Sequence, residues 1–200
     1  MRRAALIVGL LAAGAGTDGR AAPSAPPAAV SGKVEELKTI LLSRNDNDPR
    51  LDFDFNGLTP ADKRAFRELY RETRREKRNE RGTIVYLLGR NLTAPEDWAF
   101  LREVALEPPC LSLSDCSKKP APGSDEEATG DEVTLAYPSL VALRQAGRAA
   151  DEEKTRASAK SAGGTSAEKE ALALFAAAKS SKTRAVSRTA ATLERKLAPR

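Results

Sequence analysis

The sequence predicts an all-α protein: an irregular helical bundle or a short array of helices, interrupted by one long loop rich in Cys, Pro and Gly. Apolar residues make up 40% of the 200 residues, but aromatic residues only 4%. Ala and Leu dominate the apolar set and favour helices, whereas strands are enriched in β-branched and aromatic residues. Apolar residues also recur at helical spacing in several segments that start at Ser, Thr or Pro.

The N-terminal residues 1–15 have the order of a secretory signal peptide. Arg2 and Arg3 precede twelve uncharged residues that end in Ala-Gly-Ala, a small-residue cleavage site. This run is shorter than the roughly 20 apolar residues of a membrane-spanning helix. We therefore expect an exported protein, periplasmic or secreted after cleavage. Residues 16–31, rich in Ala, Pro, Gly and Ser, predict a flexible leader.

The composition excludes several kinds of function. The chain has no His, which excludes Ser-His-Asp and Cys-His catalysis and His-ligated zinc sites. Its two cysteines cannot form a four-thiolate metal site, and we expect no cofactor. The net charge of +5 is small for a chain of 200 residues, so nucleic acid is not an expected partner.

A helical domain is predicted over residues 32–146. Its first helix follows Ser31, a suitable cap, and ends in the polar turn sequence SRNDNDPR. The apolar face of this helix comprises Val34, Leu37, Ile40 and Leu41. This spacing predicts that one side of the helix packs on the rest of the domain.

The second helix has a well-marked start. Thr59 is suited to the N-cap, Pro60 to the first helical position and Asp62 to the first turn, where the helix dipole favours a carboxylate. Its predicted buried stripe comprises Ala65, Phe66, Leu69, Tyr70 and Thr73. In the overlapping charged run, residues 67–81, glutamates alternate with arginines at ion-pair spacing. This favours a solvated helix face over a face that binds nucleic acid.

Two further helices are predicted in the sequences ERGTIVYLLGR and APEDWAFLREVAL. The first is a short buried helix that closes at Gly89 or Asn91, and the second has Thr93 as its cap and Pro95 in its first turn. The pair resembles one HEAT-type unit over residues 80–107, in which a helix ending in Leu-Leu-Gly is followed by a helix that packs back on it. The resemblance implies a helical scaffold that presents a surface, and it supplies no catalytic residues to carry over to this chain. An unrelated helical bundle is the alternative.

Residues 107–132 predict a long irregular loop, which contains both cysteines. In an exported chain with two cysteines, a disulfide between Cys110 and Cys116 is the expected state. Redox-active pairs usually have two residues between the cysteines, whereas five separate them here. The spacing therefore favours a structural bond.

The C-terminal part contains a helix at 133–146, a linker at 147–166 that is at most partly helical, and a basic helical segment at 167–197. The basic surface of this segment comprises Lys179, Lys182, Arg184, Arg188, Arg195 and Lys196. A narrow apolar stripe runs along it and comprises Val186, Ala190, Leu193 and Leu197. Such a segment is suited to an anionic membrane surface or an acidic partner. Packing of the stripe on the body of the protein explains it equally well, and both alternatives stand.

The sequence DFDFNGLTPADK, residues 52–63, has two interpretations. Asp52, Asp54 and Asn56 follow the order that opens a calcium-binding EF-hand loop. A loop of normal length places Lys63 where a carboxylate is needed, and only a loop one residue shorter places Asp62 there.

We favour the interpretation that this sequence leads into the second helix. Thr59, Pro60 and Asp62, at its C-terminal end, are already explained as the start of that helix. In that case Phe53 and Phe55 pack against neighbouring helices, and the two flanking aspartates stay in solvent.

Together these features predict an exported, non-enzymatic helical scaffold or binding protein of the cell envelope, whose partner is a protein or another envelope macromolecule. One alternative is a hydrolase that uses only carboxylates, for which Glu96 and Asp97 beside Trp98 are the aromatic-flanked acids. The other alternative is calcium binding through residues 52–62.

Overall fold

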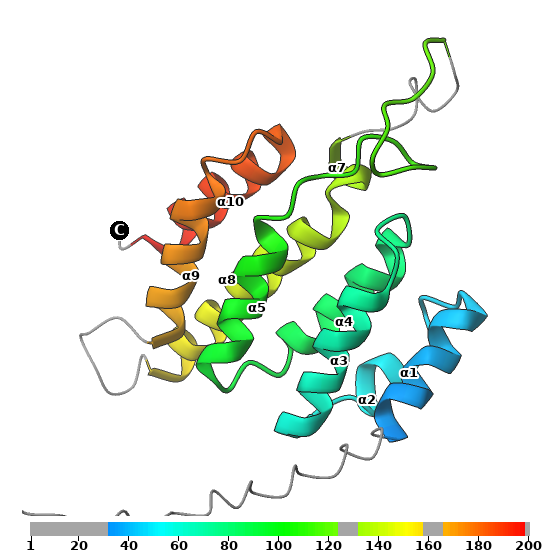
Figure 1. Ribbon diagram of the computed structural model, residues 1–200. Helices are drawn as coiled ribbons and strands as arrows, with labels where there is room; N and C mark the ends of the chain where they lie inside the picture. Colours follow the sequence, from blue (N-terminus) through cyan, green and yellow to red (C-terminus); the bar gives the residue numbers. More distant parts are fainter. Residues whose placement is uncertain (1–31, 124–131, 158–165, 199–200) are drawn as a thin grey trace, which may run out of the picture.

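The computed structural model describes residues 32–123, 132–157 and 166–198, and every regular element within these ranges is a helix (Figure 1). The all-α prediction is therefore confirmed. The predicted signal peptide and leader lie outside the described residues, as do residues 124–131 of the long loop. None of the described helices combines the length and the apolar character needed to cross a membrane.

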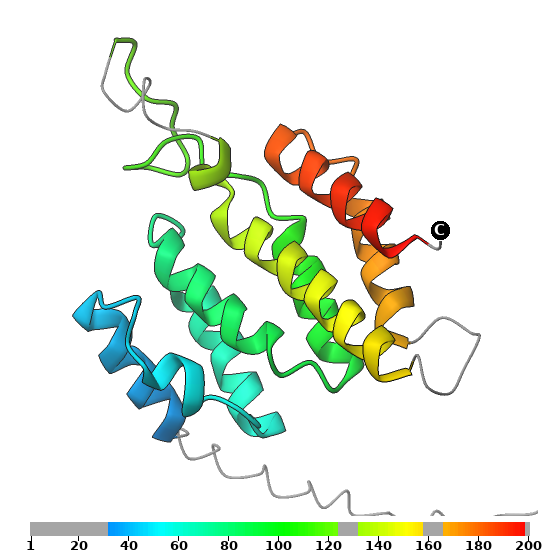
Figure 2. The same ribbon diagram turned by 180° about the vertical axis from the view of Figure 1, so that it is seen from behind.

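The helices follow each other along the chain as α1 (Gly32–Ser43), α2 (Arg50–Phe53), α3 (Pro60–Glu72), α4 (Arg78–Gly89), α5 (Pro95–Ala105), α7 (Glu132–Leu135), α8 (Tyr137–Ala157), α9 (Ser166–Ala178) and α10 (Arg184–Leu197). Three helical hairpins, α3–α4, α5–α8 and α9–α10, lie side by side (Figure 1 and Figure 2). Figure 1 is seen from the side of α3, α5 and α9, and Figure 2 from the side of α4, α8 and α10. The helices α1 and α2 lie at the outer side of the first hairpin.

The central helix is α8, which contacts α4, α5, α9 and α10. From Pro138 to Gly147, every residue except Arg144 is buried, as expected of a helix with neighbours on most sides. Two glycines of α4 allow it to approach α8 closely. A side chain at Gly82 would overlap the ring of Tyr137, and one at Gly89 would overlap Gln145.

The start of α3 has the geometry that the sequence predicts. The Thr59 hydroxyl accepts a hydrogen bond from the amide of Asp62 at 3.2 Å, and the Asp62 carboxylate accepts one from the amide of Thr59 at 2.9 Å. This reciprocal capping box satisfies two amides that the helix itself leaves without partners. Phe66 and Tyr70 of the predicted stripe are fully buried.

Replacing Thr59 with Ala should lower the free energy of unfolding by about 1 kcal/mol, the usual cost of a lost N-cap. Thr39 supplies a matched control, because its hydroxyl donates to a carbonyl within α1 and is exposed. Thr39→Ala should change the stability by less than about 0.5 kcal/mol. Urea denaturation of both variants checks this, and equal losses would contradict the capping role.

The charged run after α3 does not continue as a helix, contrary to the prediction. The helix α3 ends at Glu72, with Thr73 in an extended conformation, and α4 begins only at Arg78. The turn between them reverses the chain so that the apolar side of α4 packs on α3 and α8. Burial of that apolar side decides the break, because the run itself consists of good helix formers.

Two boundaries in the C-terminal part also differ from the prediction. The helix α8 runs to Ala157 and takes up the first half of the predicted linker, where Glu152 forms ion pairs with Arg148 and Arg156. The predicted single segment 167–197 is two helices, because a turn after Ala178 folds α10 back on α9.

Phe53 and Phe55, the two phenylalanines of the sequence DFDF, differ in burial. Phe55 is buried, as predicted, but Phe53 is 73% exposed on the short helix α2, which the sequence did not indicate. Phe53 is the last residue of α2, whereas Phe55 lies in the turn after this helix, and only Phe55 reaches the core.

Candidate functional site

Cys110 and Cys116 form a disulfide, as the sequence predicts, and both cysteines are buried. We call Cys110 to Cys116 the disulfide loop. Its backbone also pairs across the bond, with the amide of Leu111 donating to the carbonyl of Cys116 at 3.1 Å. Inside the loop, the Ser112 hydroxyl donates to the carbonyl of Asp115 at 2.8 Å and accepts from its amide at 3.1 Å. The loop is therefore ordered by its own bonds.

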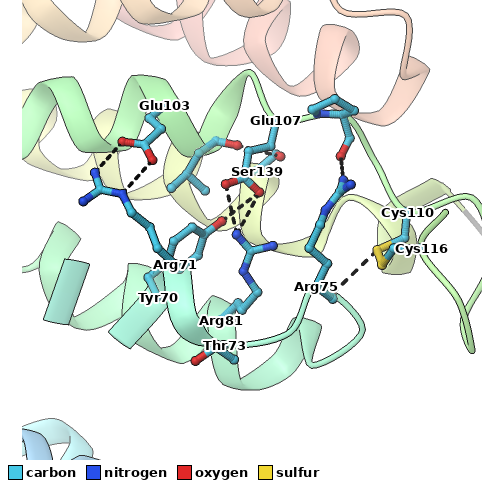
Figure 3. Close-up of polar contacts among 12 residues, drawn as sticks. Tyr70, Arg71, Thr73, Arg75, Arg81, Glu103, Glu107, Cys110, Cys116 and Ser139 are labelled. Carbon is cyan, nitrogen blue, oxygen red and sulfur yellow. Dashed lines mark hydrogen bonds and ion pairs between the residues drawn. A yellow bond between two sulfur atoms is a disulfide. The ribbon is translucent and has the colours of Figure 1, made fainter. Parts of the chain in front are cut away.

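The turn between α3 and α4, together with the first residue of α4, holds the loop against the helices (Figure 3). Arg75 donates to the carbonyl of Pro108, at the approach to the loop. Glu76 accepts a hydrogen bond from the amide of Cys116 at 3.1 Å. Arg78 donates to two successive carbonyls inside the loop, at 3.5 and 3.1 Å. The charged run that the sequence analysis assigned to a solvated helix face thus holds a loop more than thirty residues away.

A buried polar cluster lies where α3, α4 and the end of α5 meet (Figure 3). Arg81 donates to both carboxylate oxygens of Glu107, at 3.0 and 3.1 Å, and its guanidinium lies 4.0 Å from the centre of the Tyr70 ring. The Tyr70 hydroxyl donates to the same carboxylate at 3.0 Å. Burial, together with the adjacent Glu107 charge, holds the pKa of Tyr70 far above its usual value. Tyr70 therefore stays a neutral donor that supports the start of the segment leading to the loop.

These contacts leave one large apolar side chain of the disulfide loop in solvent: Leu111 is 45% exposed. The loop is also tied to α7, since the amide of Cys110 donates to the carbonyl of Leu135 at 3.1 Å. On α7, Val133 is 48% exposed. Leu111 and Val133 are therefore two apolar side chains that the fold leaves partly in solvent, on segments joined by this hydrogen bond.

The predicted basic surface lies largely on α10. Lys179 forms an ion pair with Glu194 at 2.6 Å. The exposed cations that form no ion pair with any described residue are Lys182, Arg184, Arg188, Arg195 and Lys196. Arg184, Arg188 and Arg195 share one face of the helix, given spacings of four and seven residues.

The apolar stripe of this helix packs on the body of the protein. Val186, Ala190 and Leu197 are buried, and α10 contacts α8 and α9. Leu193 lies close to Gly147 of α8. The stripe is therefore part of the core, and only the basic side of α10 faces solvent.

The two acids of the hydrolase alternative lie in different environments. Glu96 is exposed, whereas Asp97 is buried. The Asp97 carboxylate forms ion pairs with Lys63 at 2.7 Å and with Arg67 at 3.0 Å, which connects α5 to α3. These two acids therefore do not form a pair in one cleft.

The environment of Asp97 also decides its charge. Burial raises the pKa of this carboxyl, but the hydrogen bond from Lys63 and those from the amides of Thr93 and Ala94 outweigh burial. The pKa therefore lies below its usual value, and Asp97 is a structural anion rather than a proton donor. The N-cap of α5 is Ala94 and not Thr93, whose hydroxyl instead accepts from Lys63 at 2.7 Å.

The candidate calcium ligands do not converge on one point. The Asp62 carboxylate is used in the capping box of α3. Asn56 accepts from Arg90 at 2.7 Å, and Asp52 lies 3.6 Å from the same guanidinium. Asp54 is exposed. Among the described residues, no group of three or more acids or cysteines is arranged to hold a metal ion.

Comparison with protein-family models, curated proteins and solved structures finds no match for this chain. The resemblance to a HEAT-type unit therefore stays a prediction. The two helices that carry it, α4 and α5, belong to different hairpins of this structure.

Sequence reasoning missed how the disulfide loop is held and what it presents. The signal that was present is the excess of arginines over glutamates in the charged run, residues 67–81, because the glutamates cannot pair with all of these arginines within one helix. No pattern in the sequence indicates that Arg78 reaches loop carbonyls 34 and 35 residues away. Leu111 is one Leu among many, and only its place on the disulfide loop together with its exposure distinguishes it.

Proposed function

We propose that this chain is an exported, non-enzymatic helical protein of the cell envelope that binds a partner protein through the disulfide loop. The observation that carries the proposal is the exposed Leu111 on a loop held by a disulfide and by the contacts of Arg75, Glu76 and Arg78. The three hairpins act as the scaffold that supports this loop.

Preorganisation is the physical reason for this proposal. A flexible loop loses conformational entropy when a partner orders it, and this loss subtracts from the affinity. The contacts described above remove that cost before binding. Burial of an apolar side chain such as Leu111 in a partner's pocket then contributes to the affinity with little loss of conformational entropy.

The disulfide also supports the export part of the proposal, because such bonds persist in oxidising compartments. The predicted signal peptide at residues 1–15 points in the same direction. The short array of hairpins agrees with a scaffold role, since stacked helical hairpins commonly present extended surfaces for binding.

The proposal predicts a specific contact at Leu111 in the cell. A photo-crosslinking amino acid placed at this position should give a discrete adduct with one envelope protein. Leu42 is the matched control, because it is 78% exposed on α1, away from the loop. The same probe there should give no such adduct. Replacing Cys110 and Cys116 with Ser together should weaken the adduct, because the loop loses its closure.

Once the partner is isolated, Leu111→Asp should raise the dissociation constant by about tenfold or more, as expected of a central apolar anchor. Leu42→Asp should leave it unchanged. Adducts of equal yield from both positions, or an affinity that Leu111→Asp does not alter, would contradict the proposed role of the loop.

A further inference from the structure

A second feature of the surface is a groove between α4 and α8, closed on its third side by the connection from α1 to α2. Its volume is about 680 Å³, within the range of about 300–1,000 Å³ that is usual for small-ligand sites. Its lining residues on α4 and α8 belong to the two helices that lie on the near side in Figure 2, and Leu111 is not among its lining residues. It is therefore separate from the disulfide loop.

The α8 side of the groove carries a free positive charge. Arg144 is the exposed residue in the otherwise buried stretch of α8, and it forms no ion pair with any described residue. The next arginine of the helix, Arg148, bonds Glu152 and Gln145. Arg144 is thus held on a rigid helix, with its guanidinium available to an anionic group.

The side of the groove formed by the connection from α1 to α2 carries a free negative charge. Asp48 is paired with Arg50, and Asp52 contacts Arg90. Asp46 is exposed and forms no ion pair with a described residue. The groove therefore has an unpaired carboxylate on one side and an unpaired guanidinium on the other.

Two tyrosines, Tyr86 and Tyr137, also line the groove. Tyr137 lies against Gly82 of α4, where a larger residue would overlap its ring. Tyr86 donates to Asp52 at 3.4 Å, so its ring is also held. Both side chains are half-buried, which leaves an aromatic surface for the uncharged part of a ligand.

We propose that this groove binds a zwitterionic ligand, a free amino acid or a short peptide with free ends. The guanidinium of Arg144 binds the carboxylate, Asp46 binds the ammonium group, and the ligand backbone lies over Tyr86 and Tyr137. A single anion or a single cation would satisfy only one of the two free charges, whereas a zwitterion satisfies both. This inference goes beyond the proposed partner binding and does not depend on it.

The test is an amide NMR titration of the intact chain with alanine, dialanine and trialanine, which differ only in the separation of their charged ends. At least one of the three should shift signals of α4 and α8 in a saturable way. Amidation of its carboxyl end should weaken binding by about tenfold or more, the usual effect of losing a charge-assisted hydrogen bond. Acetylation of its amino end should weaken binding similarly.

Two variants assign the charges. In Arg144→Gln, amidation of the ligand should no longer matter, and in Asp46→Asn, acetylation should no longer matter. Arg64→Gln is the matched control, since Arg64 is an exposed cation of α3 outside the groove, and it should behave as the wild type. Absence of saturable shifts with all three ligands, or amidation that costs as much in Arg144→Gln as in the wild type, would overturn the proposal.

Discussion

Replacing Asp97 with Ala should lower the free energy of unfolding by about 3–5 kcal/mol, the usual cost of breaking a buried ion pair. The side chains of Lys63 and Asp97 are 4% and 3% exposed, so the substitution leaves a buried ammonium group without its counter-ion. Two amides at the start of α5 also lose their acceptor. Urea denaturation followed by circular dichroism measures the loss.

The neighbouring acid supplies the control for this prediction. Glu96 is exposed, and Glu96→Ala should change the stability by less than about 0.5 kcal/mol. Adding Lys63→Met to Asp97→Ala should recover part of the loss, because an apolar side chain replaces the unpaired ammonium group. Similar losses at the two acids would show that Asp97 is not the structural anion described above.

The same carboxylate predicts a dependence of stability on pH. Because the pKa of Asp97 is lower in the folded protein than its usual value, its contribution is complete above the unfolded pKa of about 3.9. The contribution is lost as the pH falls through the lower, folded pKa. The stability difference between the wild type and Asp97→Ala should therefore be constant near neutral pH and shrink below about pH 4.

Replacing Glu107 with Ala should cost about 3 kcal/mol, at the lower end of the range for buried pairs. Its partner Arg81 is 7% exposed, whereas Glu107 itself is 24% exposed and keeps some solvation. The Tyr70 hydroxyl loses its acceptor in the same variant. Because Glu107 starts the segment that leads to the disulfide loop, hydrogen exchange at the amide of Leu111 should also become faster.

A surface pair between α3 and α5 controls for the loss of charge. Glu103 pairs with Arg71 at 2.8 Å, but their side chains are 43% and 52% exposed. Glu103→Ala should therefore cost less than about 1 kcal/mol and leave exchange in the loop unchanged. If Glu103→Ala and Glu107→Ala destabilise equally, burial is not what makes the Arg81 pair important.

For the candidate site, the features that depend on residues close in the sequence were predictable, and those that depend on contacts between distant residues were not. The disulfide between Cys110 and Cys116 was predictable because the predicted export and the cysteine count suggest it without any geometry. The exposure of Leu111 was not, since it depends on Arg78 reaching the loop from the start of α4. The groove could not be predicted from the sequence either, because its two free charges, Arg144 and Asp46, are almost a hundred residues apart.

By itself, the sequence determined the all-α class and the start of α3 after its N-cap Thr59, and it limited the end of α4 to Gly89 or Asn91. These depend on apolar spacing and on capping within a few residues, which act before any tertiary contact forms. Only the tertiary structure decided where the charged run breaks and that α10 folds back with its apolar stripe inward. It also selected the partners of the buried charges, such as Lys63 with Asp97, 34 residues apart. Burial, which local spacing does not specify, determines whether such a charge needs a partner at all.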